Sequence, residues 1–127
     1  MTFSEGTLPA EAATAVDGRL HLAVHLPWYR SLPLSCLESL SVSLDGAPRR
    51  VERVEAAGFT GTVADAGGSE VWWDLRDPLR VVLDVPARHD DVHDVTVDLA
   101  VRVPYIEVLP GVPLVQRASA RTTVTVR

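Results

Sequence analysis

The chain has one cysteine, no lysine and no asparagine among its 127 residues. Because Cys36 stands alone, no disulfide can form within the chain, and thiol usage gives no support for an oxidising compartment. No run of about 18 apolar residues occurs, as a membrane-spanning helix would require. The first residues lack the basic and apolar regions of a signal peptide. We therefore expect a cytoplasmic protein with no membrane partner.

Positive charge is also scarce, with 12 basic residues, all arginine, against 17 acidic ones and a net charge of -5. This balance argues against binding to nucleic acid or to anionic membranes. The hydrophobic share of 46% excludes a disordered chain. The length predicts one domain over residues 1–127. We expect residues 1–15 to be a loosely ordered or edge-forming lead-in.

Alternation of apolar and polar residues with period 2 is the main pattern in the sequence, and it predicts strands with one buried and one solvated face. In residues 19–26 it places His21 and His25 on the solvated face. Further strands are predicted at residues 40–44, from 51 onward as a hairpin return after the turn Asp45-Gly46, and at 79–85, 95–103 and 122–126.

Helical periodicity is missing, whereas nine prolines and eight glycines divide the chain into short segments. Alternating strands without helical crossovers are typical of antiparallel sheets packed face to face. The sequence therefore predicts an all-β fold, a single antiparallel two-sheet β-sandwich with little helix. Both an immunoglobulin-like and a jelly-roll topology are compatible with this pattern.

Polar clusters give weak indications of chemistry. His21 and His25 lie four residues apart, which on a strand is roughly 13 Å and too far to share one metal ion. The run His89-Asp90-Asp91-Val92-His93-Asp94 offers His89, His93 and Asp94 as weak metal-ligand candidates, although acidic turns between strands are usually only solvated. Ser35 and Cys36 lack the surrounding pattern of a nucleophile. We therefore name no catalytic residue.

Three apolar segments are better candidates for contacts with a partner. The segment 26–36 is braced by proline and contains Trp, Tyr and Arg, which are common in interface hot spots. Adjacent tryptophans in a strand point to opposite faces, so one of them is hard to bury. The segment 104–114 is too rich in proline for a central strand and too apolar for an ordinary loop. The candidates for a partner interface or pocket wall are Trp28, Tyr29, Arg30, Trp72, Trp73, Tyr105 and Ile106. The alternative is local packing of these side chains on the end of the sandwich.

Residues 26–36 read Leu-Pro-Trp-Tyr-Arg-Ser-Leu-Pro-Leu-Ser-Cys and are followed by a serine-rich strand and Asp45-Gly46. With this segment and with residues 98–105, the chain resembles the beta subunit of bacterial C-glycoside deglycosidases over most of its length. The resemblance implies a small β-sandwich subunit in a heterodimer or higher hetero-oligomer. Its partner would be a TIM-barrel alpha subunit, similar to sugar isomerases, that carries a divalent metal ion such as Mn²⁺ and the principal catalytic groups.

The same resemblance implies a lyase reaction that breaks the carbon–carbon bond between a 3-oxo-glucosyl group and a flavonoid or related aromatic aglycone. An oxidoreductase would first make the 3-oxo sugar. This chain is then expected to hold no cofactor and to be inactive alone. Two alternatives stay open. One is a stand-alone intracellular carbohydrate-binding or protein-interaction module, with Trp72 or Trp73 stacked on a sugar ring. The other is a small metal-dependent enzyme built on residues 89–94.

Overall fold

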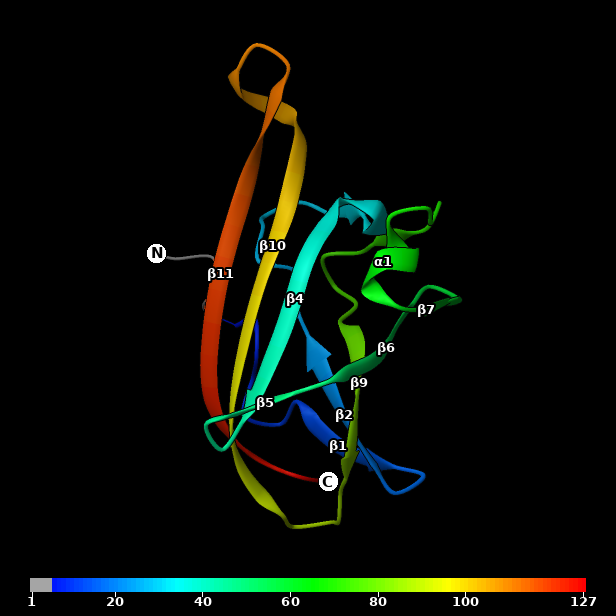
Figure 1. Ribbon diagram of the computed structural model, residues 1–127, viewed down its shortest axis with the longest axis vertical. Coiled ribbons are helices and arrows are strands. Elements are labelled where there is room, and N and C mark those ends of the chain that lie inside the picture. Colours follow the sequence, from blue (N-terminus) through cyan, green and yellow to red (C-terminus); the bar gives the residue numbers. More distant parts are fainter. Residues whose placement is uncertain (1–5) are drawn as a thin grey trace.

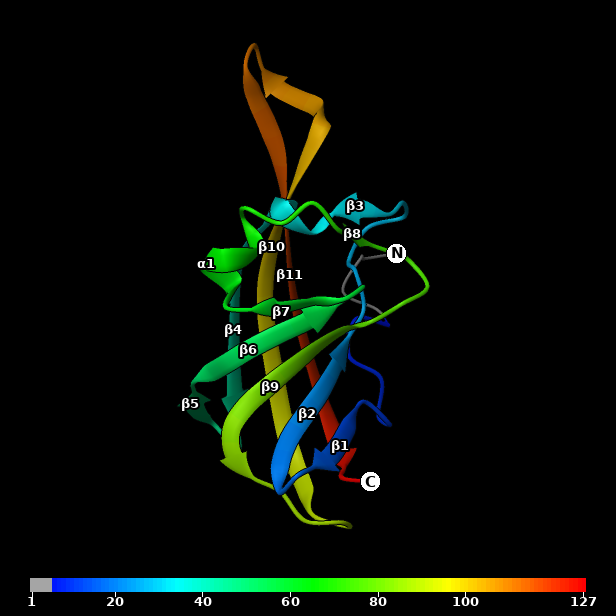
Figure 2. The ribbon, with the colours of Figure 1, turned by 90° about the vertical axis from the view of Figure 1, so that its right-hand side faces the viewer.

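A computed structural model describes residues 6–127, and it consists mostly of antiparallel strands in two facing sheets (Figures 1 and 2). The first sheet has the order β1 (Ala13–Val16), β2 (Arg19–Val24), β9 (Leu79–Pro86), β6 (Val51–Ala56) and β7 (Phe59–Gly61). The second has the order β11 (Val112–Thr125), β10 (Val92–Leu109), β4 (Leu37–Leu44) and β5 (Ala47–Arg49). The predicted all-β sandwich is confirmed.

Short elements complete the fold. The two-residue strands β3 (Leu32–Pro33) and β8 (Trp72–Trp73) pair with each other. A 3₁₀ turn, η1 (Leu34–Cys36), precedes β4, and one helical turn, α1 (Val63–Ala66), follows β7. Thr62 and Asp65 cap α1 reciprocally through side chain and backbone. Among residues 6–127 no helix has the length and apolar character needed to cross a membrane.

Two-residue turns set the register of three hairpins. Asp17-Gly18, Asp45-Gly46 and Ala57-Gly58 have positive φ at both positions, as a type I′ turn requires. The turn at Asp45 joins β4 to β5, and the chain then crosses at Arg50 to the other sheet, where β6 pairs with β9 and β7. The prediction that β6 returns along β4 is therefore wrong, because the three residues of β5 take that place.

The core lies between the two sheets and follows the alternation of the sequence. Leu20, Leu22 and Val24 of β2 are fully buried, as are Val95 and Val97 of β10. Each fully buried aliphatic side chain of this size contributes about 1.5–3 kcal/mol relative to leaving it in water. Of the opposite positions of β10, Asp98 is exposed and Asp94, Thr96 and Arg102 are partly exposed, whereas the small side chain of Ala100 is buried. Period 2 in the sequence therefore maps directly onto the inner and outer faces of this sheet.

The segment 104–114, expected to be a loop, is instead a hairpin arm. Here β10 and β11 continue past the sandwich and turn at Pro110-Gly111, where Leu109 pairs with Val112 (Figures 1 and 2). Strand β4 stops pairing with β10 at Val101, so beyond that point β10 pairs on one side only. Prolines are tolerated in such one-sided strands, which is why proline content misled the prediction. Register shifts lie between Val103 and Leu109.

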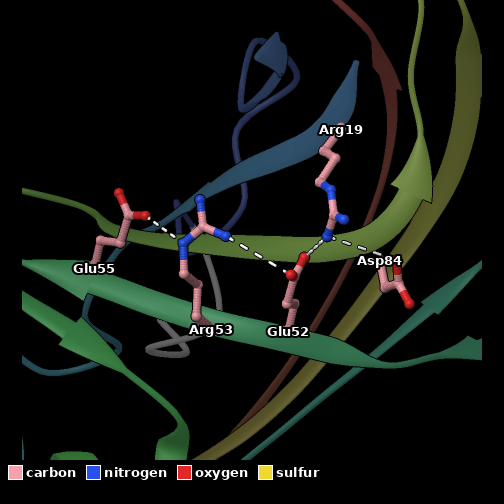
Figure 3. A network of polar contacts seen from close by, with 5 residues as sticks. All are labelled: Arg19, Glu52, Arg53, Glu55 and Asp84. Atoms are coloured by element: carbon pink, nitrogen blue, oxygen red, sulfur yellow. Dashed lines mark hydrogen bonds and ion pairs between the residues drawn. The ribbon is translucent and has the colours of Figure 1, made fainter. Parts of the chain in front are cut away.

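The outer face of the five-stranded sheet also departs from expectation. Val82 is completely buried there, and His21 is only 5% exposed, so its predicted place on a solvated face is wrong. Arg53 lies opposite the same valine in the register. Charged side chains spread over this face and form a network of Arg19, Glu52, Arg53, Glu55 and Asp84 (Figure 3). Long arginine stems cover apolar surface while their charged groups stay in water.

Distant parts of the chain close the sandwich at β1. The amide of Ala15 donates to the carbonyl of Arg127 (2.9 Å), and the amide of Arg127 donates to the carbonyl of Ala13 (3.1 Å). The Thr122 hydroxyl donates to the carbonyl of Leu8 (2.8 Å). These bonds tie residues 6–16, and β1 as an edge strand, to the C-terminal end of the chain.

Candidate functional site

The apolar segments predicted from the sequence meet at one end of the sandwich. Residues 25–31 leave β2, pass through a loop and enter β3, which pairs with β8 through Leu32 and Trp73. Figure 2 shows β3 and β8 beside the base of the β10–β11 arm. Three segments that are far apart in the sequence thus lie close together, at the place where the arm leaves the sandwich.

Aromatic side chains join the 25–31 loop to the arm. The indole Nε1–H of Trp28 donates to the Tyr105 hydroxyl at 2.5 Å. The Arg30 guanidinium lies 5.2 Å from the centre of the Tyr105 ring, within the range of a cation–π contact. The rings of Trp28 and Tyr29 are 4.9 Å apart and tilted by 44°. Trp28 is buried, whereas Tyr29 is 55% exposed and Tyr105 48%, so this cluster fixes the arm while presenting two phenol rings to solvent.

The two tryptophans of β8 divide between core and surface, as strand alternation predicts. Trp73 is 1% exposed and belongs to the core, whereas Trp72 is 57% exposed. The amide of Leu75 donates to the Ser31 hydroxyl at 2.8 Å, which ties the following turn to the 25–31 loop. Only Trp72 and Leu75 of this segment are therefore large apolar side chains available to a partner.

The arm adds a further set of exposed apolar side chains. Sequence reasoning named only Tyr105 and the half-buried Ile106 there. Val108, Leu109 and Val112 lie within the predicted segment 104–114 but were not named individually, and Val115 lies just beyond it. We define the apolar end by its exposed large apolar residues, which are Tyr29, Trp72, Leu75, Tyr105, Val108, Leu109, Val112 and Val115. A gathered apolar surface of this kind is typical of a protein-binding site.

The weak metal-ligand candidates are engaged in separate polar contacts. His93 Nδ1 lies 2.8 Å from Asp45 Oδ2, and Arg121 Nη2 donates to Asp94 Oδ2 at 2.6 Å. His89 Nε2 lies 3.3 Å from Oδ1 of its neighbour Asp90. No group of three or more His, Cys, Asp or Glu side chains that could hold a metal ion occurs in residues 6–127. These contacts brace the polar end of β10, opposite the arm.

Hydrogen bonds shape the acidity of this polar end. The bond with His93, followed by the backbone amide of Asp94, lowers the pKa of the Asp45 carboxyl. The Arg121 guanidinium lowers the pKa of Asp94. Both aspartates are therefore held as carboxylates that accept hydrogen bonds, which is a structural task.

The single thiol has no features of a nucleophile. Cys36 is buried, and burial raises the pKa of its thiol. Arg102 donates to Glu38 at 2.7 Å and also lies 3.9 Å from Cys36 Sγ, but its charge offsets only part of the rise caused by burial. A reactive cysteine needs an accessible thiol with a lowered pKa, so the environment of Cys36 is that of a core residue.

Comparison with known proteins gives a consistent result, although no family model matches the chain. A 3'-dehydrocarminate deglycosidase beta subunit from Microbacterium sp is 34% identical, with 88% of this chain and 86% of the relative covered. C-glycoside deglycosidase beta subunits from Microbacterium trichothecenolyticum and Arthrobacter globiformis are each 33% identical. The former match covers 82% of this chain and 78% of the relative, the latter 84% of each. Together with the all-β fold, this similarity shows that the chain belongs to the C-glycoside deglycosidase beta subunit family.

Proposed function

We propose that this chain is the non-catalytic beta subunit of a cytoplasmic, hetero-oligomeric carbon–carbon lyase. Its partner is a TIM-barrel alpha subunit that holds a divalent metal ion such as Mn²⁺ and the principal catalytic groups. The pair releases an aromatic, flavonoid-type aglycone from a 3-oxo-C-glucoside. The naming of its relatives as beta subunits supports a partner chain, and the apolar end supplies a surface for one.

The chemistry explains why a metal and a base are needed. A C–C glycosidic bond has no leaving oxygen to protonate, so ordinary acid-assisted hydrolysis is not available. A ketone at C3 makes the C2 proton acidic, and a divalent metal held by the partner would supply Lewis-acid polarisation that increases this acidity. A base takes the C2 proton, the electron pair forms the C1–C2 double bond, the bond from C1 to the aglycone breaks, and the aglycone carbon takes up a proton.

The donor set of this chain does not fit that metal. Within residues 6–127 no three His, Cys, Asp or Glu side chains converge. His93 is held by Asp45, and Asp94 by Arg121. The histidine with the lowered pKa, His21, lies on the outer face of the five-stranded sheet with arginines around it. The catalytic groups therefore belong to the partner in our proposal.

The apolar end is the observation that carries the proposed role of this chain. The arm bears exposed valines and a leucine that is 64% exposed at its turn, and burying them in a partner removes apolar surface from water. The contact between Trp28 and Tyr105 fixes the base of the arm, which lowers the ordering cost of docking. We propose that the arm orders active-site loops of the alpha subunit and that Tyr29 or Tyr105 forms part of the aglycone pocket wall.

Co-expression of this chain with the TIM-barrel subunit tests the proposal. The complex is purified through a tag on this chain and assayed with a 3-oxo-C-glucoside and Mn²⁺. We expect the partner to co-purify, and aglycone release to require both chains. Tyr29→Ala should lower the release rate at least about tenfold, because it removes an aromatic contact from the interface.

Val92→Ala is the matched control, since it also shortens an exposed apolar side chain but lies at the far end of β10. It should leave co-purification and rate unchanged. A monomeric chain without a partner and without activity would overturn the proposal in favour of a stand-alone binding module. If Tyr29→Ala and Val92→Ala lowered the release rate equally, the loss would not be specific to the apolar end, and the proposed role of that surface would be contradicted.

A further inference from the structure

A cavity of about 290 Å³ lies on the outer face of the five-stranded sheet, between the edge strand β1 and the start of β9. Thr14 of β1 and His21 of β2 face each other across the register, as do Ala23 of β2 and Arg80 of β9. All four residues line the cavity. Its size is close to the lower limit for small-molecule sites, and none of its lining residues belongs to the apolar end, although Pro78 follows Leu75 closely in the sequence.

His21 is the most informative residue of this cavity. It is 5% exposed, and its Nδ1 atom is buried without a hydrogen-bond partner among the described residues. An unpaired buried nitrogen destabilises the fold, and natural proteins rarely keep one without a reason. Burial, and next to it the positive charge of Arg80, lowers the pKa of the imidazole. The ring is therefore neutral near pH 7 and carries one N–H donor.

Arg80 supplies positive charge at the edge of the same cavity. Its side chain is exposed, and within residues 6–127 it forms no hydrogen bond or ion pair. The neighbouring Arg53, in contrast, is occupied by Glu55 at 2.7 Å (Figure 3). Asp17 and Glu55 are the acidic groups near His21. The free guanidinium therefore leaves the cavity with an unused anion-binding group.

We propose that this cavity binds a small monocarboxylate with a compact apolar body, such as one aromatic ring. The carboxylate would accept hydrogen bonds from the Arg80 guanidinium, in the paired geometry that arginine favours. The neutral His21 ring would donate to the same ligand, and the Thr14 hydroxyl would bond at the other side. Val16 and Pro78, which also line the cavity, would contact the apolar body.

This site does not depend on the proposed subunit function. Benzoate is the probe, titrated into the full chain while the ring resonances of all four histidines are followed by NMR. We expect a saturable shift confined to His21, with the other three histidines as internal references. Benzamide, which has the same shape without the charge, should bind at least about tenfold more weakly, because the charged hydrogen bond to Arg80 is lost.

Two variants separate a binding role from a structural one. Arg80→Gln should weaken benzoate at least about tenfold, whereas Arg88→Gln, which changes an exposed arginine away from the cavity, should leave affinity unchanged. His21→Leu removes the unpaired nitrogen, so it should raise the melting temperature while reducing benzoate binding. The proposal is overturned if benzoate does not shift His21, if benzamide binds equally well, or if Arg80→Gln and Arg88→Gln have the same effect.

Discussion

The two ends of the long strands β10 and β11 differ in the contacts that their side chains make. At the polar end, Asp45 accepts hydrogen bonds from His93 and from the Asp94 amide, and Arg121 pairs with Asp94. At the arm, the apolar side chains of Val108, Leu109 and Val112 are each exposed to solvent. The first end satisfies most of its polar groups within the described chain, although His93 Nε2 has no partner and Val92 is exposed. The second end leaves a whole set of apolar side chains uncovered.

On the same pair of strands, the polar end therefore bears mainly on the stability of the fold, and the arm bears mainly on binding to a partner. Polar contacts between exposed side chains contribute little each, about 0–1 kcal/mol for an ion pair, but they leave no surface that needs another molecule. An exposed apolar hairpin contributes little to the fold of the isolated chain, yet it gains free energy once a partner covers it. Changes at the two ends should therefore affect different measurements.

Replacing the arm should have the largest effect on assembly. Val103 and Leu114 face each other in the register, so residues 104–113 can be exchanged for Asn-Gly, which forms a two-residue hairpin turn. We expect the shortened chain to fold, because most side chains removed are exposed. Its affinity for the alpha subunit should fall at least about a hundredfold, measured by titration of the purified subunits.

A length-matched variant identifies what the arm contributes. Val108→Thr, Leu109→Thr and Val112→Thr together keep the hairpin and remove its apolar surface. Their combination should reproduce most of the loss of affinity. Normal affinity in this variant would show that backbone length, rather than apolar contact, carries the interaction.

The bond between Trp28 and Tyr105 should have an intermediate effect. Trp28→Phe and Tyr105→Phe each remove it, and each should lower the free energy of unfolding by about 1 kcal/mol or less. Since both variants break the same contact, the double variant should cost less than the sum of the two. Urea unfolding measures the energies, and relaxation of the amides in residues 106–111 reports the freed arm. Simple additivity would contradict the link between loop and arm.

Asp45→Asn should have the smallest effect and should depend on pH. The pKa of Asp45 is lower in the folded chain than in the unfolded one, so its contribution to stability is present above the unfolded pKa and is lost as pH falls through the folded value. The variant should be less stable than the parent at pH 7, and the difference should shrink as pH falls below the pKa of a free aspartate, about 3.9, and through the lower folded value.

Urea unfolding at pH 7 and at a series of acidic pH values measures the convergence. Asp98→Asn is the control, because it removes an exposed aspartate from the middle of the same strand. A constant gap between Asp45→Asn and the parent from pH 7 to pH 2 would show that these hydrogen bonds do not lower the pKa.

Local patterns in the sequence predicted the strands well, because alternation and turn residues act over a few positions. The run 95–103 appears as the inner face of β10, and Asp45-Gly46 forms the expected turn. The partner of a strand is a long-range property, so β5 displaced β6 beside β4. The arm was missed for a related reason, since the end of β4 at its pairing with Val101 decides where β10 becomes one-sided.

The site was predictable only in part. Exposure of one of two adjacent tryptophans follows from strand geometry, but the choice of Trp72 over Trp73 depends on the pairing of β8 with β3. The contact between Trp28 and Tyr105 joins residues 77 positions apart, and no local pattern encodes it. Burial of His21 on an outer face depends on side chains from β1 and β9. Alternation within β2 carries no information about these covering residues, so it predicted a solvated position.

The bonds between β1 and Arg127 bear on how the chain is made. β1 and β2 form a local hairpin, but the outer side of β1 stays unpaired until the chain as far as Arg127 has been synthesised. Contacts of such high sequence separation slow folding, and unpaired strand edges promote aggregation while they wait. The short, four-residue length of β1 limits that exposure, so an edge strand that waits for a distant part of the chain is also among the shortest in its sheet.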